Sequence, residues 1–147
     1  MKTILWTLAL AVIGLIALRF YPVDTEEYHA DPGEPDRQRS EVRLIGLDAP
    51  RFPASADDVL ETFAEIALAD FGTRLVEGSV DEGMMTFVSR SKVFGFRNFT
   101  TVKAVDEPGG AKLAVLARPR LNGYDWGVNA KRLDRWLLEL QQTLGGG

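Results

Sequence analysis

The N-terminal run of apolar residues most limits what this chain can fold into. Residues 3–18 carry no charge. A helix that is apolar on every side is buried, either in a protein core or in a membrane. With a rise of 1.5 Å per residue, a helix over residues 3–21 is about 28 Å long, close to the roughly 30 Å hydrocarbon thickness of a bilayer. Trp6 and Phe20 suit the two membrane interfaces. We therefore expect residues 1–21 to form a transmembrane anchor and residues 3–21 to contact the membrane.

Two alternatives to an anchor are a cleaved signal peptide and a buried core helix. The run ends in "IALRFYPVD", which is bulky where signal cleavage requires small residues. Lys2 precedes the run, whereas only Arg19 and the acidic "DTEEYHADPGEPD" follow it. By the positive-inside rule, we expect a single-pass inner-membrane protein with its C-terminal domain on the periplasmic side.

Composition narrows the chemistry of the rest of the chain. There is no cysteine, which excludes disulfides, thiolate metal sites and cysteine nucleophiles. Residues 22–82 hold 16 acids against 5 Lys/Arg, a net of −11, and residues 83–147 hold 5 acids against 10, a net of +5. Either the acidic segment lies against the basic one, or a basic surface meets an anion or anionic lipid.

Residues 22–54 contain five of the seven prolines and many charges, which predicts an extended spacer. "EVRLIGL" at 41–47 is the exception and predicts a short edge strand, limited by the prolines that follow. We expect residues 55–147 to form the globular domain.

Within that domain, two helices and four strands are predicted. Ser55 is a favourable N-cap for a helix with an apolar stripe, and a second stripe begins near Trp126. Strands are predicted at 73–80, 84–92, 98–106 and 111–119, joined in pairs across "DEG" and "EPGG". The fold class is therefore α+β, an antiparallel β-sheet with two helices packed on one face, preceded by an N-terminal transmembrane helix.

Enzyme signatures are weak. The only histidine, His29, lies in the predicted spacer, so a Ser-His-Asp triad within the domain and a histidine-based zinc site are excluded. No glycine-rich loop with a phosphate-binding lysine is present. We expect no catalytic residues, no cofactor, no metal and no nucleic-acid partner.

One motif stands out near the C-terminus. "GYDWGVNAKRLDRWL" follows a predicted strand that ends near Arg118 and Arg120. It resembles the "S-D-hydrophobic-G-V-N-x-x-R" signature of the uncharacterised domain of unknown function 1499 family, over about residues 55–143. The matching residues are Asp125, Gly127, Val128, Asn129 and Arg132. Tyr124 stands where that signature has Ser. The resemblance implies a bacterial or plastid, often envelope-associated protein, without naming a reaction.

Two interpretations of this junction are open. In the first, it is structural: Asp125 caps the helix through the amide of Val128, Gly127 permits close backbone approach, and Trp126 begins the buried stripe. In the second, arginines at the strand ends and the helix start frame an anionic ligand. The candidate ligand-binding residues are Arg90, Arg118, Arg120, Tyr124, Asn129 and Arg132.

These observations lead to two functional hypotheses. The first is a membrane-anchored, non-catalytic interaction or assembly domain with an unknown protein partner. The second is a module that binds a small anionic ligand or a lipid headgroup through the arginines.

Overall fold

The computed structural model describes residues 2–33, 42–91, 95–120 and 127–145. Its first part comprises a long helix, a 3-10 turn and two short strands: α1 (Lys2–Phe20), η1 (Glu26–Tyr28), β1 (Val42–Leu44) and β2 (Arg51–Phe52). A helix, four strands and a closing helix follow: α2 (Ala56–Ala69), β3 (Thr73–Ser79), β4 (Met84–Arg90), β5 (Arg97–Glu107), β6 (Gly110–Pro119) and α3 (Val128–Leu144).

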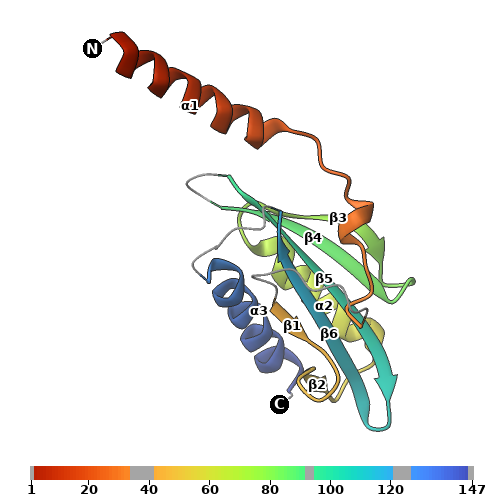
Figure 1. Cartoon of the computed structure of the whole chain (residues 1–147). Coiled ribbons are helices and arrows are strands. Elements are labelled where there is room, and N and C mark those ends of the chain that lie inside the picture. Colours follow the sequence, from red (N-terminus) through yellow and green to blue (C-terminus); the bar gives the residue numbers. More distant parts are fainter. Residues whose placement is uncertain (1, 34–41, 92–94, 121–126, 146–147) are drawn as a thin grey trace.

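The strands form one antiparallel sheet in the order β1-β6-β5-β4-β3, with β2 also paired to β6. Helices α2 and α3 pack on one face of this sheet (Figure 1). The predicted α+β class with an antiparallel sheet and two helices on one face is thus confirmed. The predicted edge strand is present as β1, whereas β2 was not predicted, because it is two residues long and depends on pairing with β6.

Helix α2 follows from local sequence signals. The Ser55 hydroxyl accepts a hydrogen bond from the Asp58 amide at 3.1 Å, and this confirms the predicted N-cap. Val59 and Phe63 lie in its buried stripe and are fully buried. Phe71 is 77% exposed because the helix ends at Ala69, before this residue.

Helix α3 begins slightly later than predicted. Its N-cap is Gly127, with φ 72°, and the predicted capping by Asp125 falls on a residue outside the described ranges. A left-handed φ is one that glycine adopts without strain. Residues 121–126, which include Asp125 and Trp126, lie outside the described residues.

The main core lies between the helices and the sheet. The Phe63 ring contacts Phe87 of β4 and Trp136 of α3, each with a centroid distance of 5.8 Å. All three side chains are buried. Because a buried aromatic removes a large apolar area from water, this trio fixes α2 and α3 to the sheet.

The other face of the sheet is covered by residues 23–32, which we call the strap. Tyr28 stacks on Phe99 of β5 at 3.9 Å between ring centroids, and His29 Nδ1 lies 2.8 Å from Thr86 Oγ1. Lys103 forms an ion pair with Asp31. This part of the predicted extended spacer is therefore packed on the sheet, because Tyr28 and the backbone around it find partners there.

Helix α1 projects away from the domain (Figure 1). Its described apolar side chains are exposed, with Leu5 at 75%, Trp6 at 71% and Ile13 at 60%. Within the residues that the structure describes, no helix has the length and hydropathy needed to cross a membrane. The transmembrane part of the fold prediction therefore has no support from the structure.

Candidate functional site

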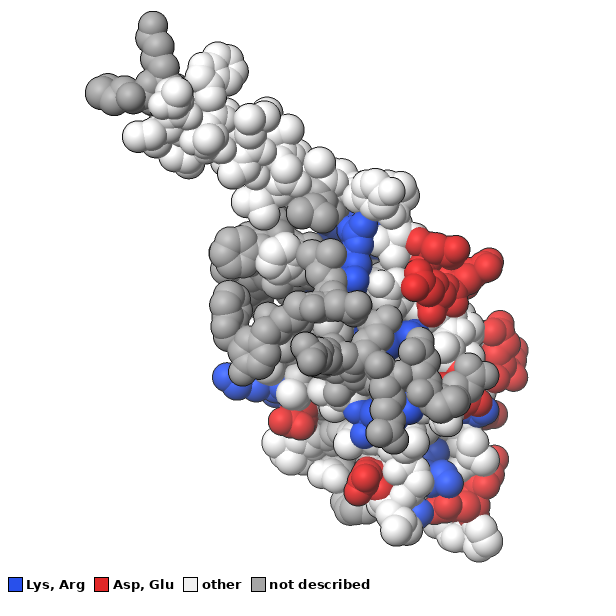
Figure 2. Space-filling view, in the orientation of Figure 1, with Lys and Arg blue, Asp and Glu red and all other residues white. Residues whose placement is uncertain are grey.

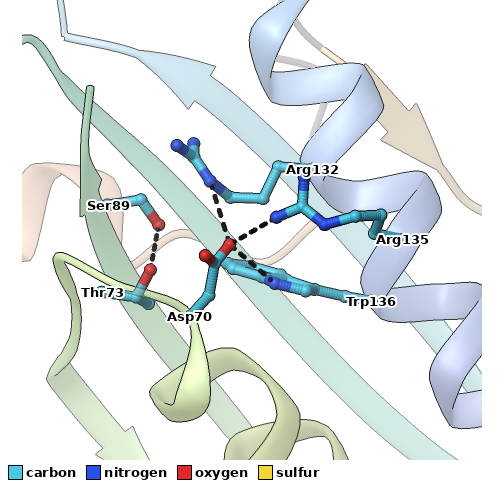
Figure 3. Close-up of polar contacts among 6 residues, drawn as sticks. All are labelled: Asp70, Thr73, Ser89, Arg132, Arg135 and Trp136. Atoms are coloured by element: carbon cyan, nitrogen blue, oxygen red, sulfur yellow. Dashed lines mark hydrogen bonds and ion pairs between the residues drawn. The ribbon is translucent and has the colours of Figure 1, made fainter. Parts of the chain in front are cut away.

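The most connected polar group on the helix-covered face is Asp70, at the C-terminus of α2 (Figure 3). Its Oδ2 accepts a hydrogen bond from Arg135 Nη2 at 2.8 Å and from Trp136 Nε1 at 3.2 Å. Arg132 Nε lies 3.5 Å from the same oxygen. All three of these partners come from α3.

This arrangement joins the two helices and neutralises the carboxylate. Two guanidinium groups and an indole N–H converge on one oxygen of Asp70. Beside it, Thr73 Oγ1 and Ser89 Oγ lie 2.8 Å apart and link β3 to β4 (Figure 3). Both sets of contacts connect separate elements of the fold. We therefore assign the Asp70 network a structural role.

Arg118, a predicted ligand-binding residue, lies on the opposite face of the sheet and is 3% exposed. Its Nη2 donates to the backbone oxygens of Tyr28 at 3.0 Å and Glu27 at 3.3 Å. Its guanidinium carbon lies 5.2 Å from the Tyr28 ring centroid. Arg118 therefore holds the strap, and the sheet separates it from Arg132.

The other predicted strand arginines lie together at one end of the strap-covered face. Arg90 is the direct cross-strand partner of Arg97, and the Arg120 amide donates to the Arg97 carbonyl at 2.9 Å. Arg90, Arg97 and Arg120 are each two residues away from Val88, Phe99 and Arg118, respectively. Side chains two residues apart in a strand point to the same face, so the three arginines share the face that carries Tyr28. Arg74 is opposite Val88 and shares that face.

We call Arg74, Arg90, Arg97 and Arg120 the arginine cluster. Burial lowers the pKa of Arg97 from its ordinary value, and the charges of Arg90, Arg120 and Arg74 lower it further. Like charges therefore act on one another from β3 across β4 and β5 to the end of β6. Such a surface attracts anions, and the guanidinium fork matches phosphate and carboxylate geometry.

The cluster also lies beside the end of α1. Arg97 Nη1 donates to the Tyr21 carbonyl at 3.2 Å, and the Arg120 guanidinium carbon lies 5.5 Å from the Tyr21 ring centroid. Figure 2 shows Lys and Arg side chains directly below the end of α1, with a group of acidic side chains to their right. The cationic surface is thus adjacent to the exposed apolar helix.

The remaining predicted site residues belong to the helix junction. Asn129 is buried in the first turn of α3, and Val128 is 40% exposed. Tyr124, Asp125 and Trp126 fall outside the described residues.

Other parts of the described chain offer less chemistry. A hollow of about 330 Å³ is lined by β2, the β5–β6 turn and Gly145, with Arg51 and Glu107 as its charged residues. Those two pair with each other at 2.8 Å. In the ranges that the structure describes, no group of three or more His, Asp or Glu comes close enough to hold a metal ion.

Comparison with protein-family models, curated proteins and solved structures finds no match to this chain. The resemblance to the domain of unknown function 1499 family therefore stays a prediction.

Sequence reasoning missed Arg74, Arg97, Tyr28 and Asp70. A signal for Arg97 exists in retrospect, because Arg90 and Arg97 flank a short segment between two predicted strands and face each other once those strands pair. Tyr28 gave no local signal, since its partners Phe99 and Arg118 are far away in the sequence.

Proposed function

We propose that this chain is a membrane-anchored, non-catalytic interaction or assembly domain. The observation that carries the proposal is the exposure of α1, whose apolar side chains face outward while the rest of the chain forms its own core. Exposing so much apolar surface to water is unfavourable, and insertion into lipid removes the cost. Residues 3–21 are the proposed membrane contact.

The proposed location is the inner membrane, with a single pass and the domain on the periplasmic side. Lys2 precedes the apolar helix, and the acidic residues of the strap follow it, which is the charge bias that orients an anchor with its N-terminus in the cytoplasm. A cleaved signal peptide would leave a free domain instead.

Fractionation and protease access test the anchor together. In a Gram-negative host, we expect the full chain to remain in carbonate-washed membranes. Protease added to intact spheroplasts should digest the domain. Recovery of the chain in the carbonate supernatant, or digestion only after lysis, would contradict the proposed anchor or its orientation.

Strand β3 supports an interaction role. Among the described strands it pairs only with β4 and ends the sheet, and such an edge can accept a further strand from a partner. A photoreactive amino acid at Leu75, which is 38% exposed, should crosslink a defined membrane protein. The matched position on α3, Leu138, is 55% exposed and should not. Equal labelling at both positions would contradict a partner at this edge.

A second candidate function is anion binding, and the arginine cluster favours it. Of the arginines predicted to bind a ligand, Arg90 and Arg120 lie in this cluster, whereas Arg118 and Arg132 are engaged in the strap and the Asp70 network. An anion site would therefore use a different set of residues from the predicted one.

We also retain the proposed membership of the domain of unknown function 1499 family. Two of its signature positions have contacts that suit a fold-defining role: Asn129 is buried, and Arg132 pairs with Asp70.

A further inference from the structure

The end of the sheet that carries the arginine cluster combines three features: positive charge, exposed aromatic rings and proximity to α1. Arg74 is exposed, and Arg90, Arg97 and Arg120 are partly exposed. Phe71 is 77% exposed and Phe96 is 41% exposed. The Gly72 carbonyl accepts a hydrogen bond from the Arg90 amide at 3.1 Å, which places the neighbouring Phe71 at the same end of the sheet.

Aromatic rings beside arginines are typical of surfaces that meet the headgroup layer of a bilayer. The rings enter the interface, and the guanidinium groups bind phosphate. Phe96 directly precedes Arg97, the first residue of β5, so both residues lie at the same end of the sheet. Tyr21, which is 64% exposed, continues this band from the end of α1.

The strap fixes the distance between this surface and the anchor. From Tyr21, whose carbonyl Arg97 binds, to Tyr28, which is buried on Phe99, the chain is tied to the sheet at both ends. Thr25 is tied in between, through its hydroxyl bond to Glu77 at 2.5 Å. A domain held this closely cannot move away on a long tether, so its arginine end remains where α1 leaves the lipid.

We propose that Arg74, Arg90, Arg97 and Arg120 form a binding site for the phosphate of an anionic phospholipid headgroup, in the membrane that holds α1. This inference rests on the proposed membrane anchor. The ligand is a lipid and not free phosphate, because Phe71, Phe96, Tyr21 and α1 offer apolar contacts that an inorganic anion does not use. The site uses the arginines for bidentate phosphate contacts.

The test uses the full chain in a mild nonionic detergent, mixed with equimolar phosphatidylglycerol and phosphatidylcholine. Native mass spectrometry then measures the ratio of the two bound lipids. We expect the wild type to retain phosphatidylglycerol preferentially. R74Q/R90Q should lower the ratio about tenfold, since each basic residue near an anionic surface contributes a severalfold preference. R51Q/K112Q removes the same charge from the far end of the sheet and should leave the ratio unchanged.

Two further variants keep the test independent of folding. R74Q changes one exposed side chain and should lower the ratio about threefold with no change in thermal unfolding. R74K/R90K retains the charge and should preserve more of the preference than the glutamine pair. Equal retention of the two lipids by the wild type, or equal losses in R74Q/R90Q and R51Q/K112Q, would overturn the proposal.

Sodium phosphate distinguishes the two sources of the anion. At matched ionic strength, we expect phosphate to displace phosphatidylglycerol no better than chloride does. Displacement by phosphate alone would assign the site to a free anion and overturn the lipid proposal. Carbonate extraction of the same variants separates the two claims: loss from the membrane indicates failure of the anchor, whereas a retained chain without lipid preference indicates failure of the headgroup site.

Discussion

The face of the sheet beneath α2 and α3 and the face beneath the strap are both covered, but by different interactions. The helix-covered face is held by apolar rings, such as Phe63 between Phe87 and Trp136. The strap is held by one stacked tyrosine, by hydrogen bonds from Arg118 and Thr101, and by the contact between His29 Nδ1 and Thr86 Oγ1. The larger apolar core therefore lies under the helices, whereas the strap-covered face carries the arginine cluster.

The arginines on the two faces of the sheet also have different surroundings. Under the helices, Arg132 and Arg135 both pair with the carboxylate of Asp70. On the strap side, Arg90, Arg120 and Arg74 lie close enough to Arg97 to lower its pKa. Grouping like charges in this way strengthens the attraction of the surface for an anion.

The largest expected effect comes from the helix-covered face. Phe63→Ala should lower the free energy of unfolding by about 3–5 kcal/mol, because it removes a fully buried ring and leaves a cavity. Urea denaturation of the full chain in detergent measures the change. Leu138→Ala on exposed α3 surface is the control, with an expected change within about 0.5 kcal/mol. A similar loss in both variants would mean that the core is not where we place it.

Arg118→Met should have a smaller effect, confined at first to the strap. It removes the charged hydrogen bonds to the Tyr28 and Glu27 carbonyls and should cost about 2 kcal/mol. Limited proteolysis should cut residues 23–33 before the domain unfolds. If the strap stays resistant while global stability falls, Arg118 belongs to the core of the domain and the two faces are not independent.

Asp70→Asn should weaken the link between the helices by about 1–2 kcal/mol, since the amide keeps the shape but not the charge that the arginines meet. Thermal unfolding checks the stability, and lipid retention should not change. A loss of phosphatidylglycerol preference in this variant would show that the Asp70 network and the arginine cluster are coupled.

The smallest effect concerns the ion pair that anchors the end of the strap. The hydrogen bond from Lys103 lowers the pKa of Asp31 below its ordinary value of 3.8. A lowered carboxyl pKa stabilises the fold above the ordinary value, and this stabilisation is lost as pH falls through the lowered one. Both side chains are over a third exposed, so the wild type should lose only about 0.5 kcal/mol more than Asp31→Asn between pH 6 and pH 3. Identical losses of unfolding free energy in the wild type and in Asp31→Asn would show that the Asp31–Lys103 pair does not stabilise the fold.

Local patterns predicted much of the domain. Strands β3 to β6 and the stripe of α2 follow from alternation, turn residues and helical spacing, which are properties of neighbouring residues. The strap was predicted as part of a spacer because residues 22–54 as a whole are rich in prolines and charges. Its packing depends on Tyr28 meeting Phe99 and Arg118, which no local pattern encodes.

Of the arginine cluster, Arg90 and Arg120 were predicted as ligand-binding residues, whereas Arg74 and Arg97 were not. Here too, the contacts depend on residues that are far apart in the sequence. The sequence placed Arg118 and Arg120 near the end of one strand, but only the pairing register between strands brings Arg90 to Arg97. The packing of α3 takes Arg132 to Asp70 instead. Burial then decides which arginines can bind: Arg118 is covered by Tyr28, whereas Arg74 at the sheet edge is exposed.

The most direct test of the central claim is to map where lipid headgroups touch the protein. The full chain would be reconstituted in vesicles containing phosphatidylglycerol with a photoreactive headgroup, and attachment sites would be located by mass spectrometry. The account predicts attachment near Tyr21 and within residues 71–75, 88–91 and 95–97, with none on α2 or α3. Attachment on α2 or α3, or none in the domain, would contradict it.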